Sequence, residues 1–144
     1  MDRIHYLLMK THLIVRRRVD ERISDLGLTP GQPKILSYLA EHGESDQTSI
    51  ARACLIRKAT IGSILKRMES QGLIQRRRSP EDSRAILVSL TPSGRDKESQ
   101  LTPIFTEAVE PIRKTLTSRQ IEQLIDLLTR VSSSLDDASQ DELD

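Results

Sequence analysis

The sequence predicts a mainly α-helical fold with one small β-hairpin, an α+β arrangement. Three observations predict it. Apolar residues recur at helical spacing through segments that end at a glycine, among them Gly27, Gly43 and Gly72. Residues 73–90 instead alternate around a Ser-Pro-Glu-Asp turn, as the strands of a hairpin do. Charged residues make up 30% of the 144 residues and aromatic residues 2%, which is typical of a soluble, helix-rich chain.

The first two helices have recognisable start and stop residues. Residues 3–26 carry apolar side chains close to helical spacing, and Gly27 is expected to stop this helix. In "LTPGQPKILSYLAEHG" Thr29 is the expected N-cap, Pro30 the first helical residue and Gln32 the partner of Thr29 in a capping box. We therefore expect a second helix that begins at Pro30.

Two shorter helices follow. Asp46 is the expected N-cap of "DQTSIARACLI". The inward side of this helix is expected to hold Ile50, Ala51 and Cys54. The next helix, "KATIGSILKRMESQG", covers about residues 57–71 and ends before Gly72. Its inward side is expected to hold Ile61, Ile64, Leu65 and Met68.

The hairpin follows directly. Its strands are expected over residues 73–78 and 85–90, joined by a turn at 79–83. In the second strand one face is expected to carry Ile86, Val88 and Leu90, although Leu87 makes the alternation imperfect. Three short helices followed by a two-stranded hairpin form the layout of a winged helix-turn-helix, in which the hairpin at about residues 73–91 is the wing. The whole lobe is expected over residues 30–92.

The C-terminal part is expected to be helical again. Thr91 or Ser93 can cap a helix that runs to about Leu116 and bends at Pro111, where proline removes a backbone hydrogen bond. A Thr117/Gln120 capping box opens the last helix.

The chain ends in a segment of a different character. Residues 136–144 contain five acidic residues and no basic one, and they are expected to form a frayed acidic tail.

Positive charge is concentrated in the predicted lobe. The net charge of the whole chain is only +1. Residues 46–92 contain nine Lys/Arg and four Asp/Glu, an excess of +5, which leaves −4 for the rest of the chain. Such a local excess favours a polyanionic partner for this lobe.

The outward side of the helix at residues 57–71 is short, polar and basic. It comprises Ala59, Thr60, Gly62, Ser63, Lys66 and Arg67, with no bulky apolar residue. A helix that enters a major groove needs small side chains for close approach, hydroxyls for base edges and cations for phosphates. Gly62 destabilises the helix by roughly 1 kcal/mol relative to Ala, and it would let the backbone lie close to DNA.

At this point the sequence resembles a known family. "TSIARAC" and "KATIGSILKRMESQGLIQRRRSPEDSRAILVSLTPSGR" are similar to the helix-turn-helix and wing of MarR-type (multiple antibiotic resistance regulator) transcription factors. The most specific part is "SPEDSRAILVSLTPSG", with its Asp-x-Arg pair Asp82 and Arg84. Two departures are visible: the recognition helix begins with Arg57 and Lys58 rather than a Ser, Thr or Asp cap, and Gly62 stands where a hydroxyl residue is common.

The resemblance implies roles for individual residues. Arg84 would reach from the wing tip into the minor groove, with Asp82 orienting its guanidinium. Thr60 and Ser63 would read base edges. Contacts with bases or phosphates are expected from Arg57, Lys58, Lys66, Arg67 and Arg78. Arg76 matches a position that is common in the family and is expected to be partly structural.

The outer helices predict a homodimer. Residues 3–26 and 93–135 carry more apolar surface than a small winged lobe can cover, and identical helices associate with two-fold symmetry. Two recognition helices would then meet successive major grooves of a pseudo-palindromic double-stranded operator. Family members are likewise dimers, and the resemblance implies a repressor whose DNA affinity a small effector lowers.

The sequence gives few indications of what the protein senses. By the resemblance, a small aromatic or anionic effector would lie near Met9, His12 and Leu13. Arg16, Arg17 and Arg18 are either an anchor for an anionic effector or a solvated face. Three scattered histidines and one inward-facing cysteine predict no metal site and no cofactor.

Other classes of function fit the sequence less well. No nucleophile–base pair or phosphate loop suggests an enzyme. One Phe, two Tyr and no Trp leave little for stacking single-stranded bases. No segment has ~20 unbroken apolar residues, so we expect a cytoplasmic protein without a membrane partner. The alternative that stays open is a winged helix that binds an acidic protein and does not read DNA.

Overall fold

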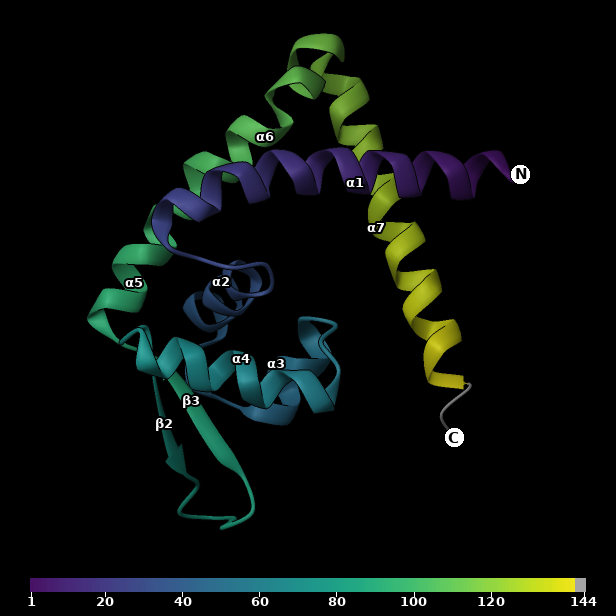
Figure 1. Cartoon of the computed structure of the whole chain (residues 1–144). Helices are drawn as coiled ribbons and strands as arrows, with labels where there is room; N and C mark the ends of the chain where they lie inside the picture. The colour runs from purple at the N-terminus through teal and green to yellow at the C-terminus, as the bar shows by residue number, and fades with distance from the viewer. Residues whose placement is uncertain (142–144) are drawn as a thin grey trace. The chain divides into compact units, whose positions relative to one another are not determined.

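The computed structural model describes residues 1–141 of the chain. The chain forms two compact units, Met1–Glu107 (unit 1) and a second that begins at Ala108 (unit 2). Unit 1 contains α1 (Arg3–Ile23), the 3₁₀ turn η1 (Ser24–Leu26), α2 (Gln32–His42), β1 (Ser45–Asp46), α3 (Gln47–Ala53), α4 (Lys58–Ser70), β2 (Ile74–Arg78), β3 (Ile86–Leu90) and α5 (Pro92–Ser99) (Figure 1). Helix α6 (Leu101–Thr115) crosses the boundary, and α7 (Ser118–Asp141) belongs to unit 2.

The predicted start and stop residues of the helices largely act as expected. Asp46 caps α3, because its carboxylate accepts from the Ser49 backbone N–H at 2.8 Å. Gly27 ends the first helical segment with φ 72° after one turn of 3₁₀ helix. Helix α2 begins two residues later than predicted, because Gly31 takes φ 95° and turns the chain before Gln32. The capping box is half made: the Thr29 N–H donates to the Gln32 side-chain oxygen at 3.1 Å.

The sheet has one strand more than the sequence predicts. Its order is β1-β3-β2, and both outer strands run antiparallel to β3. Ser45 of β1 pairs with Val88, which also pairs with Arg76 of β2. Strand β1 is only two residues long and polar, so it carries no alternation that would reveal it. The prediction of a two-stranded hairpin is therefore corrected to a three-stranded sheet.

One apolar core holds unit 1 together. It is built from the inward sides of α2, α3 and α4, the buried face of the sheet and the start of α6. Its most deeply buried members are Ile23, Ile35, Leu36, Leu39, Ile50, Ile61, Leu65, Met68, Ile74, Val88 and Leu101. Gly94 lies where α5 meets this core, and a Cβ there would stand 2.0 Å from the Leu73 carbonyl oxygen. Close packing therefore fixes how α5 follows the wing.

The helix predicted from Thr91 to about Leu116 forms as two separate helices. Thr91 caps α5 by accepting from the Gly94 N–H at 3.0 Å, but the helix stops at Gln100 and α6 begins as a separate helix. Pro111 lies inside α6, which continues to Thr115, close to the expected end at Leu116; the bend expected at Pro111 stays a prediction.

Helix α7 starts as predicted and ends later. The Thr117 N–H donates to the Gln120 side chain at 2.9 Å, and the Gln120 N–H donates back to the Thr117 hydroxyl at 3.2 Å. Its helical backbone continues to Asp141, so the expected frayed tail from Asp136 is wrong for residues 136–141. This stretch has neither glycine nor proline to stop the helix. Residues 142–144 of the expected tail lie outside the described residues.

Candidate nucleic-acid interface

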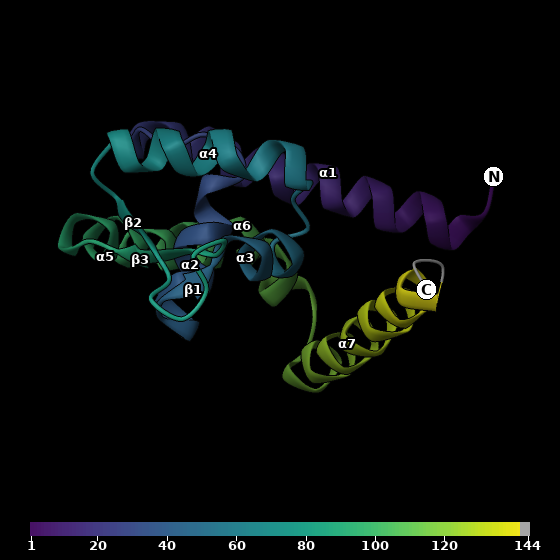
Figure 2. The same ribbon diagram turned by 90° about the horizontal axis from the view of Figure 1, so that it is seen from below.

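Helix α4 separates a buried side from an exposed one. Ile61, Leu65 and Met68 are at most 2% exposed and fix the helix against the core. The opposite side, the α4 outer face, exposes Ala59, Thr60, Ser63, Lys66 and Arg67, with half-buried Gly62 among them. Seen from below, the chain passes from one end of α4 directly into β2 of the wing (Figure 2). Packing therefore presents a short, cationic helical surface beside the wing.

The N-terminus of α4 is basic and uncapped. Arg57 is the N-cap residue, and its side chain makes no capping hydrogen bond. Lys58 is the first helical residue, and both cations are exposed. One turn later, the Ser63 hydroxyl donates to the Thr60 carbonyl at 2.9 Å, so the lone pairs of its oxygen remain available. Backbone N–H groups and two cations at one helix end attract an anion such as a DNA phosphate.

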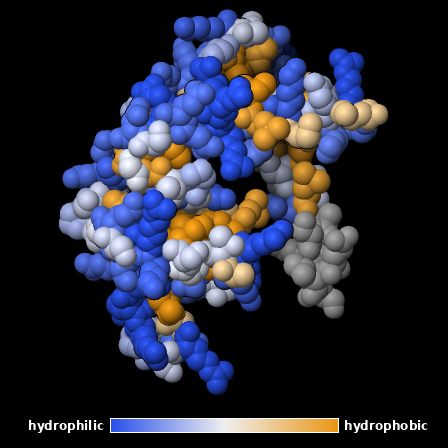
Figure 3. Space-filling model, viewed as in Figure 1, coloured by the Kyte–Doolittle hydropathy of each residue, from blue (hydrophilic) through white to orange (hydrophobic). Residues whose placement is uncertain are grey.

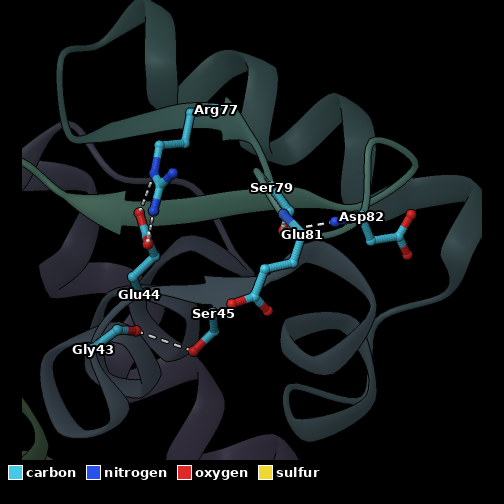
Figure 4. Close-up of polar contacts among 7 residues, drawn as sticks. All are labelled: Gly43, Glu44, Ser45, Arg77, Ser79, Glu81 and Asp82. Carbon is cyan, nitrogen blue, oxygen red and sulfur yellow. Dashed lines mark hydrogen bonds and ion pairs between the residues drawn. The ribbon is translucent and has the colours of Figure 1, made fainter.

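The three consecutive arginines of the wing have three different surroundings. Arg76 is half-buried and bonds Glu69 of α4 at 3.0 Å, which agrees with its expected structural role. Arg77 makes a bidentate pair with Glu44, at 3.0 Å from Nε and 2.6 Å from Nη2 (Figure 4). Arg78 is exposed and forms no ion pair with an acid among the described side chains. Only the third arginine is left for an external anion.

The ion pairs shift the pKa values of the carboxylates involved. The hydrogen bond from Arg77 lowers the pKa of Glu44, and the hydrogen bond from Arg76 lowers the pKa of Glu69. Both carboxylates are therefore ionised across the neutral range and hold their arginines.

The wing turn is ordered by two side chains that bond backbone amides. The Ser79 hydroxyl accepts from the N–H groups of Glu81 and Asp82 at 3.2 and 3.3 Å (Figure 4). Asp82 accepts from the Arg84 backbone N–H at 3.0 Å. No ion pair joins these two side chains in the described part of the chain, and the expectation that Asp82 orients the Arg84 guanidinium on DNA stays a prediction. A carboxylate two residues before an N–H closes an Asx turn instead.

Six exposed cations on α4, its N-cap residue and the wing are not neutralised by the protein. They are Arg57, Lys58, Lys66, Arg67, Arg78 and Arg84, and none forms an ion pair within the side chains that the structure describes. The tip of the hairpin, at the lower end of Figure 3, is covered mainly by hydrophilic residues. The arrangement suits a long polyanion that contacts a helix and a hairpin together.

Sequence reasoning missed the residues that hold the wing. Glu44 is 33 residues from Arg77, so no local pattern announces their pairing. The turn role of Ser79 could have been predicted. A serine hydroxyl that accepts from the backbone N–H two residues later is a known turn pattern.

The expected effector residues all lie on α1. Met9, His12 and Leu13 are exposed there, and their role in a pocket stays a prediction. Cys54 is buried as expected, and burial raises the pKa of its thiol. No group of three or more His, Cys, Asp or Glu among the described residues is placed to hold a metal ion.

Both outer helices expose apolar residues. On α1 these are Ile4, Leu7, Leu8, Met9, Leu13 and Ile14, and on α7 they are Ile125, Leu127, Leu128, Val131 and Leu135. Such faces mark interfaces rather than free surface. Within residues 1–141, no helix combines the length and the apolar character needed to cross a bilayer.

Comparisons with known proteins place these features in one family. A model described as the MarR family matches residues 26–85. The homoprotocatechuate degradative operon repressor of Escherichia coli is 35% identical over 102 residues, which cover 70% of this chain and 68% of that repressor. The structure of a probable transcriptional regulator from Pseudomonas aeruginosa has a TM-score of 0.75 at 32% identity, and the match covers 90% of this chain and 97% of that chain. The structure of a DNA complex of S. aureus MepR has a TM-score of 0.80 at 26% identity, and the match covers 93% of this chain and 98% of that chain.

Proposed function

Because the chain belongs to the MarR family of winged helix-turn-helix transcriptional regulators, we propose that it represses genes by binding a pseudo-palindromic operator as a homodimer. The family and its relatives are regulators rather than enzymes. The observation that carries the proposal is the set of six unneutralised cations on α4 and the wing. A repressor acts where the genes are, so we place the protein in the cytoplasm.

The contacts are divided between the two elements. The α4 outer face enters the major groove, where Thr60 and Ser63 meet base edges. Lys66 and Arg67 on the same face, and Arg57 and Lys58 at its N-terminus, meet phosphates or bases.

The wing supplies the remaining contacts. Arg84 enters the minor groove, whose negative potential favours a planar, permanently charged group. Arg78 meets the adjacent backbone. Asp82 supports this arrangement from within the turn, because it accepts from the Arg84 backbone N–H.

The dimer and the effector follow from the outer helices. The exposed apolar faces of α1 and α7 are buried in the dimer, which sets the spacing of the two recognition helices at about one turn of DNA. A small aromatic or anionic effector that binds near Met9, His12 and Leu13 changes this spacing and releases the operator. The Escherichia coli relative is named for the degradation of homoprotocatechuate, an aromatic acid, so an aromatic acid is a suitable first compound to try.

The test begins with a selection of bound duplexes from a random pool, followed by fluorescence anisotropy on the selected operator. Arg84→Ala is expected to weaken binding by about 1–3 kcal/mol, or about 5- to 150-fold in Kd. Arg119→Ala removes an exposed cation from α7 and serves as the matched control with unchanged affinity.

Salt dependence separates DNA recognition from a protein partner. A protein that makes six or more phosphate contacts loses roughly 10³-fold in affinity for duplex DNA between 50 and 200 mM salt. A folded dimer that binds no duplex at low salt would instead favour the acidic protein partner and refute the proposal.

A further inference from the structure

The strands of the sheet differ in how they connect the wing to the helix-turn-helix. Strand β1, which leads into α3, contributes only two residues to the sheet, Ser45 and Asp46, and both pair with β3. Strand β2 lies on the far side of β3 and has no backbone pairing with β1. Side chains must therefore supply any direct connection between β2 and the segment that starts the helix-turn-helix.

The Arg77–Glu44 ion pair, here called the wing clamp, makes that connection. Arg77 pairs in register with Leu87 of β3, and Leu87 pairs with Asp46 on the other side. Side chains alternate along strands, so Arg77 and Glu44 project from the same face of the sheet. The guanidinium spans β3 and grips both carboxylate oxygens of Glu44, as Figure 4 shows. Two parallel hydrogen bonds fix orientation as well as distance.

The wing has a second attachment of the same kind. Arg76, the neighbour of Arg77, projects from the opposite face and bonds Glu69 near the end of α4. Strand β2 is thus held on one face to the recognition helix and on the other to the residue before β1. Glu44 and Glu69 therefore hold β2 through its two adjacent arginines.

We propose that Glu44 is a positioning residue for operator recognition, which acts by holding Arg77 and so aims the wing tip at the minor groove. The inference rests on the proposed function above. About five residues separate Arg77 from the tip, or about 16 Å at 3.3 Å per residue. A rotation of the hairpin by about 10° at Arg77 would move its tip by about 3 Å, which is about the length of a hydrogen bond.

A simpler role for Glu44 predicts the opposite result. If Glu44 served only as a negative charge beside the interface, its removal would free Arg77 to contact phosphate. Binding to any duplex would then become tighter, with one more phosphate contact in the salt dependence. If Glu44 had no role, neither affinity would change. The sign of the change therefore distinguishes the three possibilities.

The experiment compares Glu44→Gln with Glu41→Gln. Glu41 is an exposed acid at the end of α2 that forms no ion pair with any side chain described by the structure. Kd is measured for the selected operator and for a scrambled duplex of the same length. We expect Glu44→Gln to weaken operator binding by about 5- to 10-fold, without weakening binding to the scrambled duplex. Glu41→Gln should leave the ratio of the two affinities unchanged. Equal tightening on both duplexes, or no change, would overturn the proposal.

Two further variants tie the effect to the wing tip. In an Arg84→Ala background, Glu44→Gln should cost little additional operator affinity, because the contact that it aims is already gone. The charge swap Glu44→Arg with Arg77→Glu should restore much of the lost operator affinity. Additive losses and no rescue would overturn the positioning role. Failure of the wild-type protein to bind any duplex would refute the proposed function itself, which makes the two failures distinguishable.

Discussion

Gly62 is the position where the fold and the proposed function make opposite demands. It lies in the interior of α4, where glycine destabilises a helix by about 0.8–1.0 kcal/mol relative to alanine. Nothing in the packing requires it: the nearest atom to a Cβ at this position is the Gln47 side-chain nitrogen, at 3.8 Å, an ordinary van der Waals distance. Gly62→Ala should therefore stabilise the protein by about 1 kcal/mol and raise Tm by about 4 °C.

The same methyl group should weaken DNA binding. Gly62 is flanked on the α4 outer face by Ser63 and Lys66, so an added methyl would stand between the helix and the groove. A poorly accommodated methyl costs about 1 kcal/mol or more, or at least about 5-fold in Kd for the operator. The assay pairs a thermal melt of the free protein with anisotropy on the operator.

A second helical glycine provides the control. A Cβ at Gly94 would stand 2.0 Å from the Leu73 carbonyl oxygen, so Gly94→Ala should lower Tm sharply. The two substitutions thus have opposite expected effects on stability. If Gly62→Ala raised Tm and left operator affinity unchanged, the recognition helix would not approach DNA through this face, and the reasoning would fail.

Two predictions concern the helix-turn-helix itself. Asp46→Ala removes the N-cap of α3 and should cost about 1 kcal/mol in urea unfolding. Hydrogen bonds from the Ser49 side chain and backbone lower the pKa of Asp46. The stability that the Asp46 cap contributes is therefore present above the pKa of Asp46 in the unfolded chain and is lost as pH falls through its pKa in the folded chain. The difference in unfolding free energy between wild type and Asp46→Ala should vanish in acid. Leu55 has φ 54° and is 82% exposed, so Leu55→Gly should relieve backbone strain and stabilise the fold by about 1 kcal/mol. An unchanged urea midpoint would contradict this strain.

Local sequence determined where several of the helices begin. Asp46, Thr117 and Gln120 satisfy backbone groups within three residues of themselves, so their roles are visible without any tertiary contact. The inward residues of α3 and α4 were equally predictable, because helical periodicity alone decides which side chains share a face. The same periodicity left a short, basic outer face, from which the major-groove role was predicted.

Tertiary structure decided what holds the wing. Strand β1 exists only because β3 offers it a partner, and the pairing of Arg77 with Glu44 joins residues 33 positions apart. Three adjacent arginines look equivalent in the sequence, yet two are held by carboxylates and one is exposed to an external anion. The physical reason is that periodicity and capping act over a few residues, whereas the surroundings of a charge depend on which distant segments the core brings beside it.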